Sequence, residues 1–133
     1  LSHNDLNEIP LVHERFIKNQ IVSFIDISYN RIKEIKLNTF PKSHTREILL
    51  RNNLIIHLDK GVFKNLSRLN HLDLSVNCLE YLDNNFADGM FNLKFLNLSF
   101  NKIGYIHKHS FKSLMNLIEL DLSMNNLSQI DSS

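Results

Sequence analysis

The chain has 133 residues, of which 43% are hydrophobic, with 15 Lys and Arg against 14 Asp and Glu. This length suits one ordinary globular domain, and the near-neutral charge gives no basic footprint for nucleic acid or a membrane surface. No apolar run reaches the ~18 residues that span a bilayer, and a single cysteine excludes an internal disulfide framework.

One six-residue pattern recurs along the chain. In chain order it appears as "IDISYN" at 25–30, "ILLRNN" at 48–53, "LDLSVN" at 72–77, "LNLSFN" at 96–101 and "LDLSMN" at 120–125. The final Asn of each copy lies 23 or 24 residues from the next one. The alternating apolar residues before each Asn predict a short strand with one buried face. One strand per repeat would therefore stack in parallel into a sheet.

Further apolar residues follow each Asn at fixed offsets and would point into the interior of each coil. The tenth residue after it is Phe40, Phe63 or Phe111, which predicts a stacked phenylalanine spine. In one repeat Ala87 takes this position and Phe86 comes one residue early, so we expect the spine to shift there. A single repeat cannot bury its apolar face alone, so several coils must fold together.

The repeated Asn has a predicted structural role. The chain turns sharply after each strand, which leaves peptide groups without a partner in the sheet. An amide side chain offers both donors and an acceptor, so a buried Asn can bond peptide groups of its own and a neighbouring coil. We therefore interpret a ladder of asparagines as structural: Asn30, Asn53, Asn77, Asn101 and Asn125.

A fixed period of 20–29 residues with the pattern L-x-x-L-x-L-x-x-N-x-L is typical of leucine-rich repeats. The segments "IDISYNRIKEI", "LDLSVNCLEYL" and "LNLSFNKIGYI" resemble the 24-residue "typical" repeats of Toll and Toll-like receptor ectodomains and of chaoptin-like adhesion proteins. The resemblance implies an α/β leucine-rich-repeat solenoid, a curved right-handed superhelix. Its concave side would be a parallel β-sheet with one short strand per repeat, and its convex side would be mostly irregular.

The repeats occupy residues 1–133 as about five to six coils. Because no cysteine-rich cap flanks them, we expect an uncapped fragment of a longer ectodomain. The resemblance implies a location outside the cell or at its surface. The resemblance implies a non-enzymatic recognition module of a Toll-like innate immune receptor. A chaoptin-like cell-adhesion protein is the alternative, and a cytosolic scaffold is a further one. The expected partner is a protein ligand or co-receptor on the concave face or a flank, with a possible homo- or heterodimer and no cofactor, nucleic acid or membrane contact.

The residues six, four and two before each Asn should face the concave side, and the residue just before it should lie near the rim. Side chains on adjacent strands would then form columns. One group combines exposed apolar side chains with charged ones and is the candidate binding patch: Phe24, Glu47, Leu49, Arg51, His71, Asp73 and Phe95. The alternative interpretation is local charge neutralisation by Arg51, placed diagonally between Asp26 and Asp73.

His71, Asp73 and Ser75 face the same way on one predicted strand and suggest a catalytic triad. Alternate residues on a strand are about 6.6 Å apart, which is poor geometry for a base held by a third group. Asp and Ser also recur at the same offsets in other repeats that have no His. We therefore expect no catalytic residues.

His107 and His109 suggest a metal site, but two ligands do not complete a zinc site. We expect solvated histidines and no bound metal. Cys78 follows an Asn of the ladder at a position of mixed composition, which places it near the surface.

Three sequons are candidates for N-glycosylation, at Asn65, Asn97 and Asn126. Chance alone gives roughly two in a chain so rich in Asn and Ser, so they are only compatible with secretion. Asn97 should lie exposed on the concave face. A glycan there would move binding toward the coils around Arg51 or onto a flank.

Two segments depart from the regular repeat. "PLVHERFIKNQ" at 10–20 is two residues longer than the norm, and "PKSHTRE" at 41–47 is one residue short. In the second, Ser43 and Thr45 occupy sites usually held by Leu. Such coils indicate a bend, a partner contact or weak packing.

Overall fold

The computed structural model describes residues 1–9, 22–40 and 44–130. The long segment at 10–20 and Ser43 lie outside the described residues. Thr45 is fully buried, and its Oγ1 donates to Val22 O at 3.0 Å. A hydroxyl therefore replaces the usual Leu at this site with its hydrogen bond satisfied.

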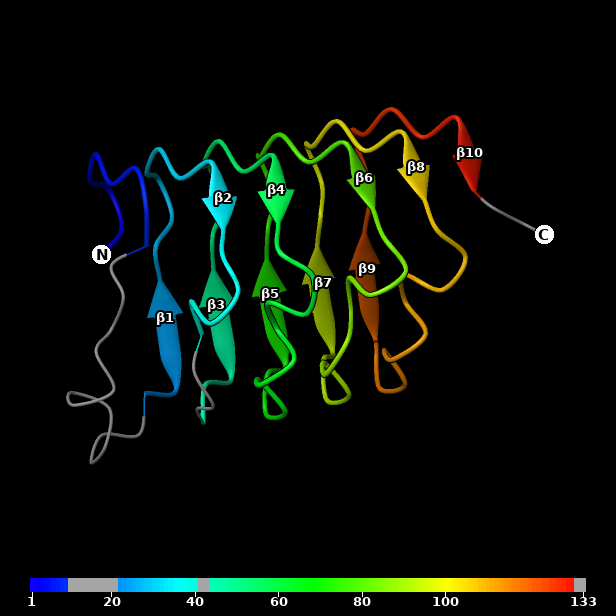
Figure 1. Ribbon diagram of the computed structural model, residues 1–133, viewed down its shortest axis with the longest axis horizontal. Coiled ribbons are helices and arrows are strands. Elements are labelled where there is room, and N and C mark those ends of the chain that lie inside the picture. Colours follow the sequence, from blue (N-terminus) through cyan, green and yellow to red (C-terminus); the bar gives the residue numbers. More distant parts are fainter. Residues whose placement is uncertain (10–21, 41–43, 131–133) are drawn as a thin grey trace.

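The main sheet contains one three-residue strand from each repeat, stacked in parallel in the order β1-β3-β5-β7-β9 (Figure 1). The middle residue of the inner strands is buried, because Leu or Ile there alternates with side chains of the opposite face. The pairing keeps each column in register, so that Glu47 lies beside His71 and His71 beside Phe95. The strands are β1 Phe24–Asp26, β3 Glu47–Leu49, β5 His71–Asp73, β7 Phe95–Asn97 and β9 Glu119–Asp121.

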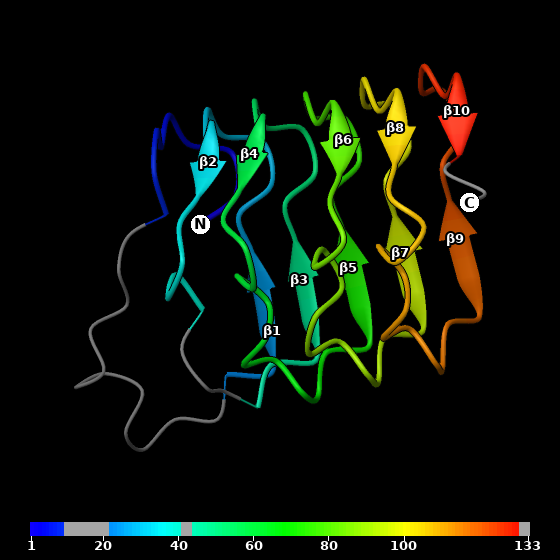
Figure 2. The same cartoon turned by 45° about the vertical axis from the view of Figure 1, so that its right-hand side comes forward.

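Each repeat also has a second, two-residue strand on an adjacent wall of the coil (Figure 2), which the sequence pattern did not predict. These lateral strands are β2 Glu34–Ile35, β4 His57–Leu58, β6 Tyr81–Leu82, β8 Tyr105–Ile106 and β10 Gln129–Ile130. They form two separate sheets, β2-β4 and β6-β8-β10. The lateral wall is therefore interrupted between β4 and β6, whereas the main sheet is continuous.

Turns and irregular segments close each coil, and no helix occurs in the described ranges of the chain. Among those residues there is accordingly no helix long and apolar enough to cross a membrane. The parallel main sheet and the irregular return side together form a leucine-rich-repeat solenoid.

The core runs through the stacked coils as one cluster of Leu, Ile and Phe side chains. A phenylalanine spine follows the return side, with ring centroids 5.9 Å apart for Phe40–Phe63, 6.4 Å for Phe63–Phe86 and 6.2 Å for Phe86–Phe111. Phe86 thus joins the spine although it comes one residue early, and Ala87 is buried beside it. The shift changes the stacked Phe40–Phe63 geometry to edge-on contacts on both sides of Phe86.

Gly89 allows two coils to approach closely. It has φ +86°, and a Cβ at this position would lie 2.4 Å from Lys64 Cα and 2.5 Å from Lys64 O. Gly61 also has a positive φ, +71°, but a Cβ there would meet only the side chain of Lys64, at 3.4 Å. Both positions favour glycine through their backbone conformation, and only Gly89 also needs the space.

We predict that Gly89→Ala destabilises the chain far more than Gly61→Ala. Gly61→Ala should cost roughly 1–2 kcal/mol for the left-handed backbone alone. Gly89→Ala adds a clash with the backbone of the neighbouring coil, so its cost should be on the order of 4 kcal/mol. Urea unfolding followed by circular dichroism measures both. Equal losses in the two variants would contradict the close approach at Gly89.

Candidate functional site

The asparagines of the ladder each bond two coils. In the central case, Asn77 Oδ1 accepts from Ile55 N–H at 3.0 Å, and its Nδ2 donates to Leu50 O at 3.0 Å in the preceding coil. The same Nδ2 donates to Leu74 O at 3.1 Å in its own coil. Equivalent bonds are made by Asn30, Asn53, Asn101 and Asn125. Four of the five are buried, and Asn125 in the last of these coils is half-buried.

The residue before each of these asparagines, and before Asn4, lies in the left-handed region of the backbone. The rim residues and their φ values are His3 57°, Tyr29 57°, Asn52 54°, Val76 54°, Phe100 53° and Met124 54°. The residue types do not predict this conformation, because only two of the six, His3 and Asn52, are types that favour it. The turn directs the following Asn inward and leaves an exposed apolar stripe on the rim, in which Tyr29, Phe100 and Met124 are exposed.

The structure brings the residues of the candidate patch together on β1, β3, β5 and β7. Phe24 and Phe95 are 51% and 39% exposed at its two ends. Between them, His71 Nδ1 lies 3.2 Å from Glu47 Oε1, and the His71 ring centroid lies 6.0 Å from that of Phe95. The patch is thus a continuous row in which two exposed aromatic rings enclose a polar pair.

Arg51 follows β3 and crosses toward the next coil, where its Nη1 donates to Ser75 Oγ at 2.9 Å. In the part of the chain that the structure describes, it makes no ion pair with Asp26 or Asp73. Direct neutralisation of those carboxylates therefore does not explain its position. Arg51 is instead half-buried across the centre of the patch.

The carboxylates beside Arg51 have a local structural role. Asp26 Oδ1 accepts from Ser28 N–H at 2.9 Å, and Asp73 Oδ1 accepts from Ser75 N–H at 2.8 Å. Asn97 and Asp121 make the same bond to the residue two positions on, at 2.9 Å each. Leu49 holds this column position in its own coil and cannot accept a hydrogen bond, so it brings an apolar side chain to the middle of the patch.

Three of the serines two residues before a ladder Asn are less open to the concave face than the sequence predicts, whereas Ser123 is exposed. Ser75 is 0% exposed and accepts a hydrogen bond from Arg51, and Ser28 and Ser99 are buried to a similar degree. His71 is turned toward Glu47 and not toward Ser75. The His71, Asp73 and Ser75 side chains therefore lack the relay of hydrogen bonds that a catalytic triad requires.

Hydrogen bonding also lowers the pKa of two of the carboxylates that accept from the N–H two positions on, Asp26 and Asp121. Burial of Asp26 disfavours its ionised form, but hydrogen bonds from the Ser28 N–H, the Ser28 hydroxyl and the Ser2 hydroxyl outweigh it and hold its pKa below the ordinary 3.8. The pKa of Asp121 is lowered by the Ser123 hydroxyl and N–H and by the Ser99 hydroxyl, against a smaller effect of burial. Both groups remain ionised through the neutral range.

The remaining candidate residues lie apart from the patch. His107 Nδ1 accepts from the backbone N–H of His109 at 3.1 Å, and the two rings meet edge-on. Among the described residues, no group of three or more His, Cys, Asp or Glu side chains is placed to hold a metal ion. Cys78 is a free, half-buried thiol.

The three sequon asparagines differ in accessibility. Asn126 is exposed, whereas Asn65 and Asn97 are half-buried. Asn97 is less open than expected, because its Oδ1 turns toward Ser99 and accepts from that residue's N–H and hydroxyl at 2.9 Å and 2.7 Å. A glycan is carried by Nδ2, so glycosylation of Asn97 would leave these two bonds in place.

We predict that Asp26→Asn makes the free energy of unfolding fall less steeply as the pH is lowered into the acid range (the acid limb of the stability profile). The folded-state pKa of Asp26 is lowered, so its contribution is present above the ordinary value of 3.8 and is lost as the pH falls through the folded-state pKa. Asn keeps the acceptor but cannot titrate, so the variant should lack the contribution of the ionised group at neutral pH, approach the stability of the parent chain in acid, and lose less stability as the pH falls. Asn97→Asp is the reverse control and should steepen the acid limb. Urea unfolding between about pH 7 and pH 2.5 measures this, and parallel profiles for all three proteins would refute it.

Comparison with known proteins agrees with this architecture. A family model described as "Leucine rich repeat" matches residues 43–103 and 91–133. Leucine-rich repeats and immunoglobulin-like domains protein 2 is 33% identical in Mus musculus and 34% identical in Homo sapiens, each over 88 residues. Each alignment covers 50% of this chain and only 8% of the relative.

A solved structure gives the same architecture in three dimensions. The crystal structure of the TLR13-ssRNA13 complex matches with a TM-score of 0.69 and 29% sequence identity. The match covers 75% of this chain and 15% of that chain, so this chain spans a small part of its structural neighbour, as it does of its curated relatives. With the family model matching more than half of its residues, the chain belongs to the leucine-rich-repeat family.

Proposed function

We propose that the chain is a ligand-recognition segment of an extracellular, Toll-like receptor ectodomain, and that its concave sheet binds a protein ligand or co-receptor. The main support is the patch of Phe24, Glu47, Leu49, His71 and Phe95 on adjacent strands, with Arg51 across it. Exposed aromatic rings and a half-buried Arg are the residue types that dominate binding energy at protein interfaces. The likeness to the TLR13 chain supports the receptor class.

A protein ligand fits the charge of the patch better than RNA, although the structural neighbour is a complex with single-stranded RNA. Affinity for nucleic acid depends on Lys and Arg contacts to phosphates. Here Glu47, Asp73 and the adjacent Asp26 outnumber the single Arg51. Carboxylates in these positions would repel a phosphate backbone.

We predict that alanine substitutions in the patch weaken binding to the partner. The chain, displayed as a multivalent fusion, would be screened against a panel of secreted and cell-surface proteins. Phe95→Ala should reduce the affinity for the partner about 30-fold, as expected for an interface residue worth about 2 kcal/mol. Leu49→Ala and Arg51→Ala should each reduce it several-fold. Surface plasmon resonance measures these changes.

The control is Met115→Ala, which changes a side chain that is 82% exposed in the turn before β9 and should leave the affinity unchanged. Unchanged affinity in all three patch variants would refute the patch. A 13-nucleotide single-stranded RNA should not bind at about 0.15 M salt, and saturable binding abolished by Arg51→Ala would favour nucleic acid over protein. Binding only to a second copy of the chain on an opposing cell would favour an adhesion role.

We also predict that the chain acquires N-linked glycan when it passes through a secretory pathway. Asn126 is the most accessible sequon asparagine, so Asn126→Gln should remove one glycan from the secreted protein. Asn97 is the second candidate because its Nδ2 can carry a sugar without loss of the Oδ1 bonds. Peptide mapping by mass spectrometry measures occupancy. Secreted, folded protein with all three sequons bare would argue against an extracellular location.

A further inference from the structure

The lateral strands are joined by backbone hydrogen bonds that repeat from coil to coil. Next to β2 and β4, Ile56 N–H donates to Lys33 O and Asp59 N–H donates to Ile35 O, both at 2.9 Å. The same two bonds recur next to β6 and β8, from Gly104 N–H to Glu80 O at 2.9 Å and from His107 N–H to Leu82 O at 3.1 Å. This pair of bonds therefore marks a closed junction between coils.

The junction between β4 and β6 is open. The matching bonds would join Glu80 N–H to Ile56 O and Asp83 N–H to Leu58 O, and neither forms in the described part of the chain. Cys78 N–H still donates to Ile55 O at 2.9 Å, and β3 pairs with β5 in full register. The two coils are thus joined along the main sheet and separate only on this flank, where Figure 1 and Figure 2 both show β4 and β6 standing apart.

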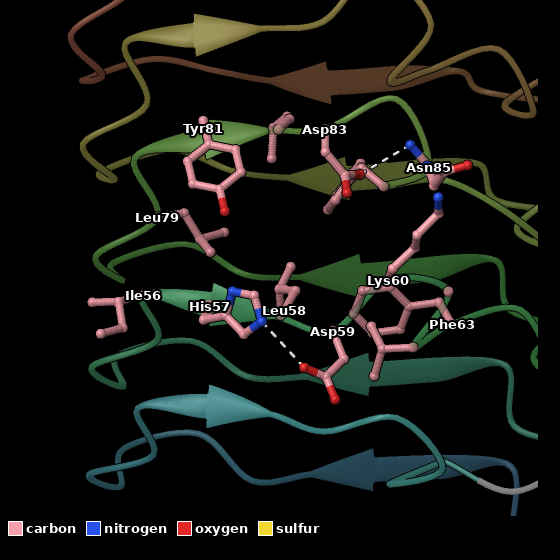
Figure 3. Close-up of a pocket in the computed structure, with 14 residues that line it drawn as sticks. Ile56, His57, Leu58, Asp59, Lys60, Phe63, Leu79, Tyr81, Asp83 and Asn85 are labelled. Atoms are coloured by element: carbon pink, nitrogen blue, oxygen red, sulfur yellow. Dashed lines mark hydrogen bonds and ion pairs between the residues drawn. The ribbon is translucent and has the colours of Figure 1, made fainter.

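The open junction exposes apolar surface. Leu58 is half-exposed, whereas its counterparts Ile35 and Leu82 are each 1% exposed. A cavity of about 120 Å³ lies there, with Leu58, Leu79 and Phe63 among its apolar lining residues (Figure 3). A cavity of about 150 Å³ holds a benzene molecule, so this one suits a single side chain between Leu and Phe in size.

The mouth of the cavity is acidic. Asp59 Oδ1 lies 3.1 Å from His57 Nε2, and its Oδ2 accepts from Leu37 N–H at 2.7 Å. The Leu37 bond is the main cause of a lowered pKa for Asp59; it outweighs the opposing effect of burial, and His57 lowers the pKa further. Asp83 Oδ1 accepts from Asn85 N–H at 2.9 Å.

Lys60 closes one end of the cavity. It lies beside Asn85 across the gap (Figure 3), and with the Asn85 amide oriented to satisfy its neighbours, the Oδ1 accepts from Lys60 Nζ at 3.1 Å. The Asn85 Nδ2 then donates to Asp88 Oδ2, also at 3.1 Å. Lys60 is thereby directed to an amide, and Asp83 remains the carboxylate best placed to meet a cation at the mouth.

We infer that this gap is a strand-addition site for an extended peptide with an apolar side chain of Leu to Phe size and a basic side chain two positions along. The peptide backbone would pair with the carbonyl groups of Ile56 and Leu58 and the N–H groups of Glu80 and Asp83, as a strand does at a sheet edge. Residues two apart in a strand face the same side at about 6.6 Å spacing, so the apolar side chain enters the cavity and the basic one meets Asp83. This site is separate from the concave patch and is independent of the receptor class proposed above.

Amide hydrogen exchange of the isotope-labelled 133-residue chain tests the inference directly. In the free protein, the amides of Glu80 and Asp83 should exchange faster than those of Gly104 and His107, which are bonded at the closed junction. The probe is the blocked peptide acetyl-Thr-Leu-Thr-Lys-Thr-amide. At saturation it should slow exchange of Glu80 and Asp83 at least about tenfold, whereas the peptide with Ser in place of Leu should not.

Two variants and one control complete the test. Leu58→Trp fills the cavity from a half-exposed position and should abolish protection by the peptide, whereas Tyr105→Ala on β8 should retain it. Asp83→Asn keeps the acceptor for Asn85 N–H and tests the site without changing the cavity volume. It should weaken the Lys-containing peptide at least threefold and leave unchanged the affinity of a peptide with Ser in place of Lys.

Three outcomes would overturn the inference. The first is no effect of the Leu-containing peptide at millimolar concentration. The second is peptide binding that leaves the Glu80 and Asp83 amides unprotected. The third is protection of these amides by a disaccharide such as maltose but not by the peptide, which would make the gap a carbohydrate site.

Discussion

The asparagine amide that bonds two successive coils is the interaction on which the solenoid depends. Asn77 supplies an acceptor to Ile55 N–H and donors to Leu50 O and Leu74 O, at distances of 3.0–3.1 Å. An Asp in its place would keep the acceptor but lose the donors, and each unpaired buried carbonyl would cost about 1–3 kcal/mol. The same requirement in every coil explains why Asn occupies this position in all five repeats, whereas the residues at the concave positions vary.

The inward Asn imposes a second constraint on the residue before it. That residue is left-handed in six successive turns, including a β-branched Val76 at φ 54°. The conformation costs about 1–2 kcal/mol for an L-residue, but the rim N–H then bonds the next coil, as Val76 N–H does to Ser99 O at 2.9 Å. Where a further coil follows, this hydrogen bond offsets part of the strain. The rim can therefore carry Tyr, Phe and Met, which gives the solenoid an apolar edge beside its concave face.

The repeat period and the alternation of apolar residues were sufficient to predict the main sheet, its register and the columns on its concave face. They could not predict the lateral strands, because two residues per coil are too few for an alternating pattern. They also missed the burial of Ser28, Ser75 and Ser99. The contact of Arg51 with Ser75 was missed as well, since it depends on the reach of a side chain from an adjacent coil. The need for glycine at Gly89 was likewise invisible, because it arises from the backbone of Lys64 in another repeat.

The division of stacking between two walls explains how one flank can open without loss of the fold. The main sheet and the asparagines hold the coils at every junction, including the one where β4 and β6 separate. The lateral bonds missing there are few, and a hydrogen bond contributes only about 0.5–1.5 kcal/mol net. A lateral junction can therefore vary without altering the geometry of the concave columns. The concave columns and the flank are thus structurally separable, because β3 and β5 stay in full register although β4 and β6 are not paired.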